Sequence, residues 1–187
     1  MKLDVETGLL EQARKVPSPN QDERPAGCEP ELLVIHSISL PPGEFGGPWI
    51  EHFFCNTLDT SVHPYFAEIA ELKVSAHLLI RRDGELVQFV PFNRRAWHAG
   101  VSCYENRERC NDFSIGIEME GTDAGDFTNA QYAALVELVD AFDEAYPGIS
   151  PERIAGHSDI APGRKRDPGP GFDWLDLRRQ VEARRSV

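Results

Sequence analysis

The sequence predicts one α/β (α+β) domain in which a central mixed β-sheet of about five or six strands is covered by helices. Residues 32–38 are apolar on both alternating faces, which is typical of a strand buried on both sides within a sheet. Residues 75–90 have the composition of two strands joined by an Asp-Gly turn. Residues 128–146 carry apolar side chains at helical spacing. Strands in the first two thirds, with helices among and after them, indicate a sheet that helices cover.

The first 31 residues are expected to form an extended N-terminal arm that packs on the domain formed by residues 32–187. A polar, turn-forming stretch at 17–25 follows a short amphipathic segment of the arm. The apolar residues of this segment are Leu9, Leu10, Ala13 and Val16. A length of 187 residues fits one domain with a substantial core.

Loops rich in Pro and Gly, short helices and strands alternate in the middle of the chain. Residues 41–48 contain too many helix and strand breakers to be anything other than a loop. Pro64 is tolerated in the first turn of a helix and therefore does not exclude one there. The predicted elements are helices at 49–56 and 64–72, antiparallel strands at 75–80 and 86–90, and a short strand or loop edge at 96–100.

Residues 114–120 alternate strictly between two kinds of side chain, as one strand does. One face holds Ile115, Ile117 and Met119, and the other holds Gly116, Glu118 and Glu120. The carboxylate face is therefore expected to border something polar.

Two further helices are predicted in the last third of the chain. Thr128 followed by Gln131 forms a capping box at the start of the helix at 128–146, and Pro147-Gly148 ends it. The last helix begins at the N-cap candidate Asp173 and carries Trp174, Leu177 and Val181.

Between these helices, residues 156–171 form a stretch so rich in Gly and Pro that neither helix nor regular strand is expected. The stretch contains His157, Lys165 and Asp167. Loops held by a rigid scaffold often carry function, so this loop is the first candidate for a functional site.

The charge balance excludes some classes of partner. The chain has 31 acidic and 19 basic residues and a net charge of -12, which disfavours binding to nucleic acid or to anionic lipid. Neither an export signal nor a membrane-spanning run is recognisable, so a cytoplasmic protein is expected. Its cysteines are then expected to be reduced, with a Cys103–Cys110 disulfide as the alternative.

Two histidines and one aspartate have the character of zinc ligands. His36 lies at the end of a buried strand, and Asp167 lies ten positions after His157 in the loop. Two imidazoles and a carboxylate leave a fourth position open, as in a catalytic zinc site. His36 and Asp167 are 131 positions apart, however, so the three residues form no compact motif, and the pattern by itself leaves other roles open.

The remaining four histidines can be interpreted as surface or structural residues. His52 and His63 are expected at the surface or at helix ends. His77 suits a hydrogen-bonded core position at least as well as a site, and His98 suits either a substrate contact or a structural role.

Six segments resemble, in order and spacing, the zinc-dependent N-acetylmuramoyl-L-alanine amidases, which share their fold with bacteriophage T7 lysozyme and the peptidoglycan recognition proteins. The resemblance covers roughly residues 30–175. Residues 41–48, 110–113 and 167–170 resemble the cytoplasmic branch that acts on 1,6-anhydro-muropeptides during cell-wall recycling. The six segments are 34–39, 75–77, 82–84, 96–100, 114–118 and 156–169.

The resemblance implies a role for five residues. His36, His157 and Asp167 match the ligands of a Zn²⁺ cofactor, Glu118 the acid that handles the attacking water, and Lys165 a cation beside the reacting carbonyl. The residues alone leave two alternatives: Glu118 as an edge carboxylate paired with an arginine, and Lys165 as a solvated charge.

The implied substrate is a small anhydro-N-acetylmuramyl peptide, handled by a monomer without nucleic acid or membrane. Candidate substrate contacts are Trp97, Arg109, Lys73 and His98. Ser37 and Lys73 depart from the asparagine and arginine expected from the resemblance, and a lysine lacks the bidentate fork for a peptide carboxylate. The alternatives are a muropeptide-binding module without activity and an enzyme acting on the intact wall.

Overall fold

A mixed six-stranded sheet lies at the centre of the computed structural model, which describes residues 1–185. Its strands lie in the order β12-β5-β11-β6-β7-β3. The sheet and its covering helices confirm the predicted fold class. The strands are β3 (Arg14–Lys15), β5 (Leu32–Ile38), β6 (Leu78–Ile80), β7 (Leu86–Gln88), β11 (Ser114–Glu120) and β12 (Ile154–Gly156).

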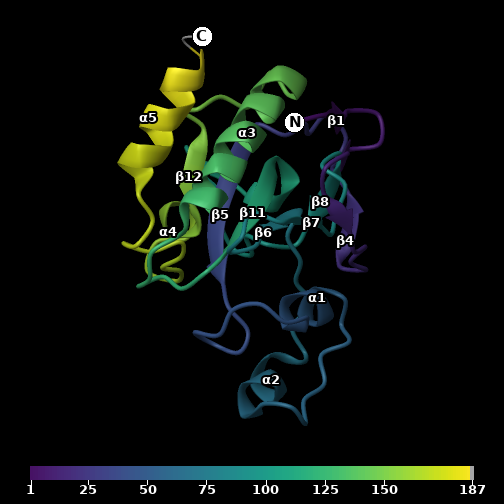
Figure 1. The fold of residues 1–187 in the computed structure, drawn as a ribbon. Helices are drawn as coiled ribbons and strands as arrows, with labels where there is room; N and C mark the ends of the chain where they lie inside the picture. Colours follow the sequence, from purple (N-terminus) through teal and green to yellow (C-terminus); the bar gives the residue numbers. More distant parts are fainter. Residues whose placement is uncertain (186–187) are drawn as a thin grey trace.

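Helices lie against the sheet and at one end of the molecule (Figure 1). The long helix α3 (Asn129–Ala145) crosses the sheet, and α5 (Trp174–Arg185) lies beside it. Helices α1 (Trp49–Phe54) and α2 (Pro64–Ile69) lie together at the end opposite α5. Both of these short helices end two or three residues before the predicted positions.

The four strands β12, β5, β11 and β6 run parallel and form the buried centre of the sheet. In β5, Leu33 and Ile35 pack in the large apolar cluster that includes α3. Leu32 and Val34 point to the other face and pack with Phe113 in a smaller cluster. The prediction of a strand covered on both faces is therefore confirmed.

Strand β11 has the two unlike faces that its alternation predicts. Ile115, Ile117 and Met119 are fully buried in the large apolar cluster. Glu118 and Glu120 are also buried, with only 9% and 1% of their surface exposed. Burying two carboxylates is costly unless each has a partner or is protonated.

Strands β6 and β7 form the predicted antiparallel hairpin, with Leu78 opposite Gln88 and Ile80 opposite Leu86. Gly84 in the turn has a φ of +89°, which residues with a Cβ rarely adopt. The Asp-Gly signal therefore identified both the turn and the pairing.

Helix α3 begins as predicted, with a complete capping box at Thr128 and Gln131. The Thr128 side chain accepts a hydrogen bond from the Gln131 N–H, and the Gln131 side chain accepts one from the Thr128 N–H. Helix α5 packs through Leu177 and Val181 on the large apolar cluster that includes α3, which confirms its predicted apolar face.

The two short helices enclose a second apolar cluster between themselves and the sheet edge. Phe54 and Phe66 from these helices are fully buried there with Phe89, which follows β7. The predicted helix-end role of His63 is confirmed, because its Nδ1 accepts a hydrogen bond of 3.2 Å from the Tyr65 N–H.

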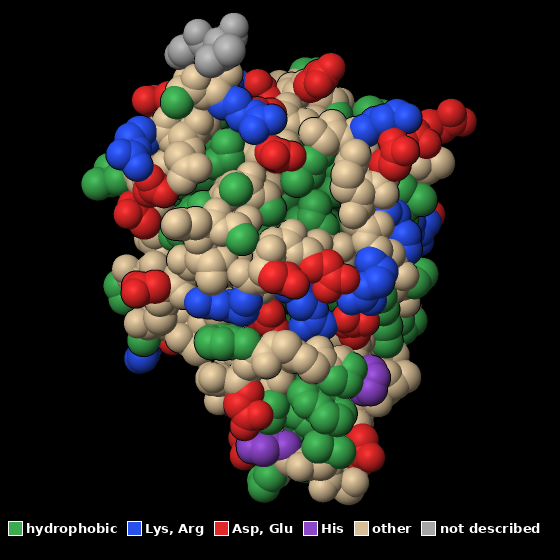
Figure 2. Space-filling view, viewed as in Figure 1, with side chains coloured by type: hydrophobic (Ala, Val, Ile, Leu, Met, Phe, Trp, Pro, Cys, Tyr) green, Lys and Arg blue, Asp and Glu red, His purple; other side chains and the backbone are tan. Residues whose placement is uncertain are grey.

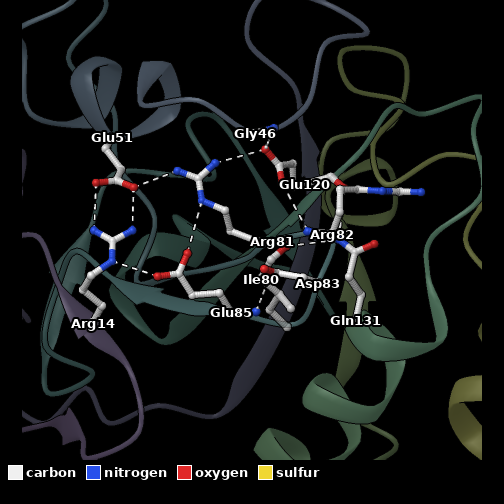
Figure 3. Close-up of polar contacts among 10 residues, drawn as sticks. All are labelled: Arg14, Gly46, Glu51, Ile80, Arg81, Arg82, Asp83, Glu85, Glu120 and Gln131. Carbon is white, nitrogen blue, oxygen red and sulfur yellow. Dashed lines mark hydrogen bonds and ion pairs between the residues drawn. The ribbon is translucent and has the colours of Figure 1, made fainter.

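A network of ion pairs joins β3, α1, the β6–β7 turn and the end of β11 (Figure 3). Arg81 donates to Glu51 at 2.7 Å and to Glu120 at 3.1 Å, and Arg14 donates to Glu51 and to Glu85. Hydrogen bonds from Arg14 lower the pKa of Glu51 to about 2. The network gives the buried Glu120 a charged partner and attaches α1 to the sheet.

The N-terminal arm contains more regular structure than its composition indicates. Its strands are β1 (Leu3–Asp4), β2 (Leu9–Leu10), β3 and β4 (Gln21–Glu23). Strand β3 pairs with β7 and forms one edge of the central sheet, and β4 pairs with β8 (Arg94–Ala96). Strands of two or three residues are too short to show alternation, so the sequence gives no signal for them.

The region between β8 and β11 holds the short pair β9 (Cys103–Tyr104) and β10 (Arg107–Glu108), then a 3₁₀ turn at Cys110–Asp112. All four cysteines are free, so the alternative Cys103–Cys110 disulfide does not form.

The prediction for residues 156–171 is wrong at their start. Gly156 ends β12, and residues His157–Ile160 form one helical turn, α4. The Asp159 side chain stabilises this turn by accepting a hydrogen bond of 2.7 Å from the Gly156 N–H. Composition missed this turn because a side-chain contact, rather than helix propensity, holds it.

Charged side chains of both signs intermingle across the middle of the face drawn in Figure 2, with no extended basic area. Hydrophobic side chains gather at the end where α1 and α2 lie. Among residues 1–185, no helix is both long and apolar enough to cross a membrane.

Candidate functional site

His36, His157 and Asp167 come together at the carboxyl ends of two neighbouring parallel strands. Ile35 in β5 pairs with Gly156 in β12, so the residues that follow each of them lie side by side. His36 Nδ1 is 3.0 Å from His157 Nδ1 and 3.1 Å from Asp167 Oδ2. His157 Nδ1 is 3.0 Å from the same carboxylate oxygen. Among the described residues, these three form the group of side chains with the spacing of a metal site.

The ring nitrogens that point away from the cluster have partners of their own. His157 Nε2 lies 3.2 Å from the carbonyl oxygen of Ala99, which can only accept, so Nε2 carries the proton and Nδ1 keeps a lone pair that can bind a metal ion. His36 Nε2 lies 2.9 Å from Nδ1 of His98. Two imidazole nitrogens and one carboxylate oxygen, with their outer atoms held, fit a catalytic zinc ion.

The electrostatics favour the ligand forms of these side chains. Burial lowers the pKa of His36 to about 4, so its imidazole is neutral at pH 7. Burial by itself would raise the pKa of Asp167, but the close contacts with His157 and His36 outweigh it and lower the pKa of this carboxyl group. The site thus combines neutral imidazole with an ionised carboxylate, the pairing that metal binding requires.

Glu118 lies beside the cluster, directly opposite His36 in the β11–β5 register. Its Oε2 is buried and has no hydrogen-bond partner among the described residues. Burial and the nearby Asp167 raise the pKa of Glu118 well above its usual value, against an opposing effect of Lys165. The alternative of an edge carboxylate paired with an arginine does not describe Glu118, because β11 is a central strand and the arginine beside it, Arg81, pairs with Glu120 instead.

A cavity of about 550 Å³ opens over this cluster. Glu118 and the exposed Lys165 line it together with the three clustered residues. Its opposite wall is apolar and comes mainly from α1, α2 and the segment after α2, with Phe53, Phe54, Tyr65, Ile69, Leu72 and Val74.

The predicted substrate contacts are dispersed. Lys73 is exposed between two residues that line the cavity, and Trp97 is half-buried next to His98. Arg109 forms an ion pair of 3.3 Å with Asp112 and lines a second cavity of about 560 Å³ on the other side of Arg164. Of the four, only His98 contacts the cluster, and it does so through His36.

His77 belongs to the core rather than to the cavity. Its Nδ1 accepts from the Gly116 N–H at 3.0 Å, and its Nε2 then donates to the carbonyl oxygen of Arg94 at 3.1 Å. Both ring nitrogens are therefore used within the fold.

The structure adds residues that the sequence did not single out. Arg164 donates to the carbonyl oxygens of Ala99 and Val101, both at 2.6 Å, and so fixes the loop to the segment behind His157. Asn111 Oδ1 accepts from the N–H groups of both His98 and Ala99. The basic run 164–166 was the one sequence signal for the first of these contacts, and nothing in the sequence indicated the second.

Comparison with known proteins places this geometry in a family. A family model described as N-acetylmuramoyl-L-alanine amidase matches residues 26–170. The 1,6-anhydro-N-acetylmuramyl-L-alanine amidase AmpD of Escherichia coli K12 is 62% identical over 174 residues, which are 93% of this chain and 94% of the relative. A crystal structure of an AmpD derivative has 60% identity and a TM-score of 0.93, covering 97% of this chain and 99% of the other.

A more distant structure is the complex of the N-acetylmuramyl-L-alanine amidase AmiD from E. coli with the substrate anhydro-N-acetylmuramic acid-L-Ala-D-γ-Glu-L-Lys. It is 32% identical, with a TM-score of 0.57, and the match covers 84% of this chain and 60% of that one. From a family model that spans most of the sequence and relatives that match it nearly end to end, we conclude that the chain belongs to the N-acetylmuramoyl-L-alanine amidase family.

Proposed function

We propose that this protein is a zinc-dependent amidase that cleaves the bond between the lactyl group of 1,6-anhydro-N-acetylmuramic acid and the L-alanine of the stem peptide. The observation that carries the proposal is the cluster of His36, His157 and Asp167 beside the buried, unpartnered carboxyl of Glu118. The names of the AmpD relatives support the choice of the anhydro sugar.

His36 Nδ1, His157 Nδ1 and Asp167 Oδ2 would hold the zinc ion. When bound, the ion supplies a Lewis acid for the scissile carbonyl and lowers the pKa of water toward about 7. Glu118 accepts the proton of the attacking water and returns it to the leaving amine of L-alanine. Its raised pKa suits this role, because a carboxyl group that both takes and gives a proton works best when its pKa lies near the working pH.

Lys165 brings a positive charge into the same cavity, where it stabilises the negative charge that develops on the carbonyl oxygen during attack. One preorganised donor of this kind typically contributes about 3 to 4 kcal/mol to catalysis. The apolar wall opposite offers Phe53, Tyr65 and Ile69 to the non-polar faces of the sugar and peptide.

We further propose that the protein works as a cytoplasmic monomer in the recycling of peptidoglycan fragments. The names of the relatives support the substrate, and the mixed surface charge is consistent with a small muropeptide rather than a polyanion as the ligand. Trp97, Arg109 and Lys73 stay as proposed substrate contacts.

The test is to incubate the purified, zinc-loaded protein with anhydro-N-acetylmuramyl tripeptide and to measure released tripeptide by mass spectrometry. Release in the wild type, and its loss in Asp167→Ala together with bound zinc, is the expected result. Tight binding of the muropeptide without cleavage would instead support the non-catalytic binding module.

A further inference from the structure

A series of hydrogen bonds leads from the outer ring nitrogen of His36 through His98 to Ser114. His36 Nε2 lies 2.9 Å from His98 Nδ1, and His98 Nε2 lies 3.2 Å from the hydroxyl oxygen of Ser114. The Ser114 hydroxyl lies 2.6 Å from the carbonyl oxygen of Cys110, which is the last group in the series. Ser114 and Cys110 are fully buried.

The hydrogen bond between Ser114 and Cys110 fixes the direction of every other hydrogen bond in this series. A carbonyl oxygen only accepts, so the single hydroxyl proton of Ser114 goes to Cys110. The Ser114 oxygen is then free to accept from Nε2–H of His98. A neutral imidazole has one N–H, so Nδ1 of His98 must accept, and the proton of His36 lies on Nε2. The Nδ1 atom of His36 is left unprotonated and faces His157 and Asp167.

The ring of His98 can take this orientation because residue 116 is a glycine without a side chain. A Cβ placed on Gly116 would lie 2.4 Å from Cγ and 2.5 Å from Nδ1 of His98, far inside contact distance. The imidazole therefore packs directly on the backbone of β11. Any side chain at position 116 would displace the ring from His36.

The main chain of the same segment serves the second imidazole. Ala99 accepts from His157 Nε2 through its carbonyl oxygen, and Asn111 Oδ1 binds the N–H groups of both His98 and Ala99. The side chain of His98 thus binds Nε2 of His36, and the backbone of the next residue, Ala99, binds Nε2 of His157.

We propose that His98 is a positioning residue that sets the tautomer and orientation of His36 for metal binding, with Ser114 and Gly116 as its supports. This inference rests on the proposed zinc site. Partners of this kind typically change metal affinity by about 10- to 100-fold when removed. His98 is therefore assigned to the metal site rather than to the substrate.

The experiment compares His98→Phe, which keeps a ring but offers no acceptor, with His98→Asn, whose side-chain oxygen can take the place of Nδ1. Zinc affinity is measured by competition with a chromophoric chelator. The tautomer of His36 is read from ¹⁵N–¹H correlation spectra of the zinc-free protein. We expect His98→Phe to bind zinc about 10- to 100-fold more weakly and to lose the single Nε2–H tautomer, and His98→Asn to recover most of both.

Ser114→Ala is a second, smaller change, because it removes the hydroxyl group without adding atoms. It should leave the fold intact, as judged by circular dichroism, yet free His98 to change tautomer and thereby mix the tautomers of His36. This variant carries the test if His98→Phe does not fold.

Unchanged zinc affinity and an unchanged His36 tautomer in His98→Phe, or in Ser114→Ala if His98→Phe does not fold, would overturn the inference while leaving the proposed function intact. Weak zinc binding with an unchanged tautomer would also overturn it, since His98 would then act by packing alone. Failure of the wild type to bind zinc would instead refute the zinc site itself.

Discussion

The carboxyl group of Glu118 differs from its neighbour Glu120 in one respect that bears on chemistry. Glu120 is bound by Arg81 and by two backbone N–H groups, from Gly46 and Arg82, whereas Oε2 of Glu118 has no partner among the described residues. Both lie on the same face of β11, two residues apart. The partnered carboxyl group is bound within the fold, whereas the other keeps an oxygen free, as the proposed proton transfer requires.

Replacing Glu118 with glutamine tests this role. The amide keeps the shape of the side chain but cannot take a proton, so kcat should fall by about 10²- to 10⁴-fold. Zinc content, measured by atomic absorption, should equal that of the wild type. An activity within a few-fold of the wild type would show that another group accepts the proton.

A second prediction concerns the stability of the zinc-free protein as the pH changes. Burial lowers the pKa of His36 to about 4 and the pKa values of His77 and His98 well below 6.5. Between pH 6.5 and 4.5 the unfolded chain therefore binds protons at these three positions that the folded protein refuses, and stability falls as the pH falls. Glu118 has the opposite sign, because its raised pKa makes the folded form bind one proton more in this range.

Three histidines outweigh one carboxyl group, so the free energy of unfolding should rise with pH across this window. Each net proton corresponds to a slope of about 1.4 kcal/mol per pH unit. Urea denaturation at several pH values measures the slope, and His77→Gln should reduce it. A flat profile between pH 4.5 and 6.5 would contradict the burial of these histidines as neutral groups.

Helix α3 shows how a short sequence pattern sets the start of an element. The Thr128 hydroxyl group accepts from the Gln131 N–H and donates to the carbonyl oxygen of Arg82 at 2.7 Å, so one side chain caps the helix and fixes it to the turn after β6. The capping box places the first residue of the helix where the sequence predicts it.

Thr128→Val removes both hydrogen bonds but keeps the size of the side chain. The loss of a cap of this kind typically costs about 0.5 to 2 kcal/mol of stability. Thr128→Ser keeps the hydroxyl group and should restore most of the difference in urea denaturation. Equal stability of the valine and serine variants would argue against capping as the stabilising contact.

The Arg81–Glu120 pair is the buried part of the ion-pair network in Figure 3. Arg81→Met should reduce the free energy of unfolding by about 3 to 5 kcal/mol, because it leaves the charge of Glu120 buried without its partner. The double variant with Glu120→Gln should recover part of this loss, which a double-mutant cycle measures.

Arg14→Met is the matched control in that network, because Arg14 is partly exposed and its ion pairs are screened by solvent. It should cost less than about 1 kcal/mol. Strictly additive losses in the Arg81 and Glu120 variants would show that the two side chains do not stabilise each other.

At the scale of the whole molecule, the cavity lies where the sheet meets the segment that contains α1 and α2. The sheet supplies His36 and Glu118, the loop after α4 supplies Lys165 and Asp167, and the two short helices supply the apolar wall. Three parts of the sequence must therefore be folded before the cavity exists.

Zinc binding should consequently stabilise the folded protein as a whole. At a free zinc concentration 100 times the Kd, binding adds about 2.7 kcal/mol to the free energy of unfolding. Thermal denaturation with and without zinc should show this increase in the wild type and not in Asp167→Ala. Asp123→Ala, an exposed acid that also lines the cavity, is the control and should keep the increase.

The sequence predicts those parts of the fold in which a pattern of buried and exposed side chains continues over several residues. Strands β5 and β11 and helix α3 have such patterns over seven residues or more. Strand β3 was missed because two residues carry no period, and its position is decided by backbone pairing with β7. Helix α4 was missed because its stabilising contact comes from Asp159 within a Gly- and Pro-rich stretch.

The same distinction applies to the site. His36, His157 and Asp167 are recognisable by residue type, and the resemblance to a family predicts that they bind one metal ion. The contacts behind them join His98 to Ser114 and Ala99 to Asn111, between residue types that occur throughout any sequence. Their roles depend on distances that only the folded sheet defines.

The pairing of β5 with β12 also has a consequence for the order of events during synthesis. His36 leaves the ribosome more than a hundred residues before His157, and the edge that unites them forms only when residues 154–156 join the sheet. A nascent chain that has exposed only its first half presents one histidine of the cluster and no closing carboxylate. We therefore expect a metal ion to bind at the proposed site only after β12 has joined the sheet.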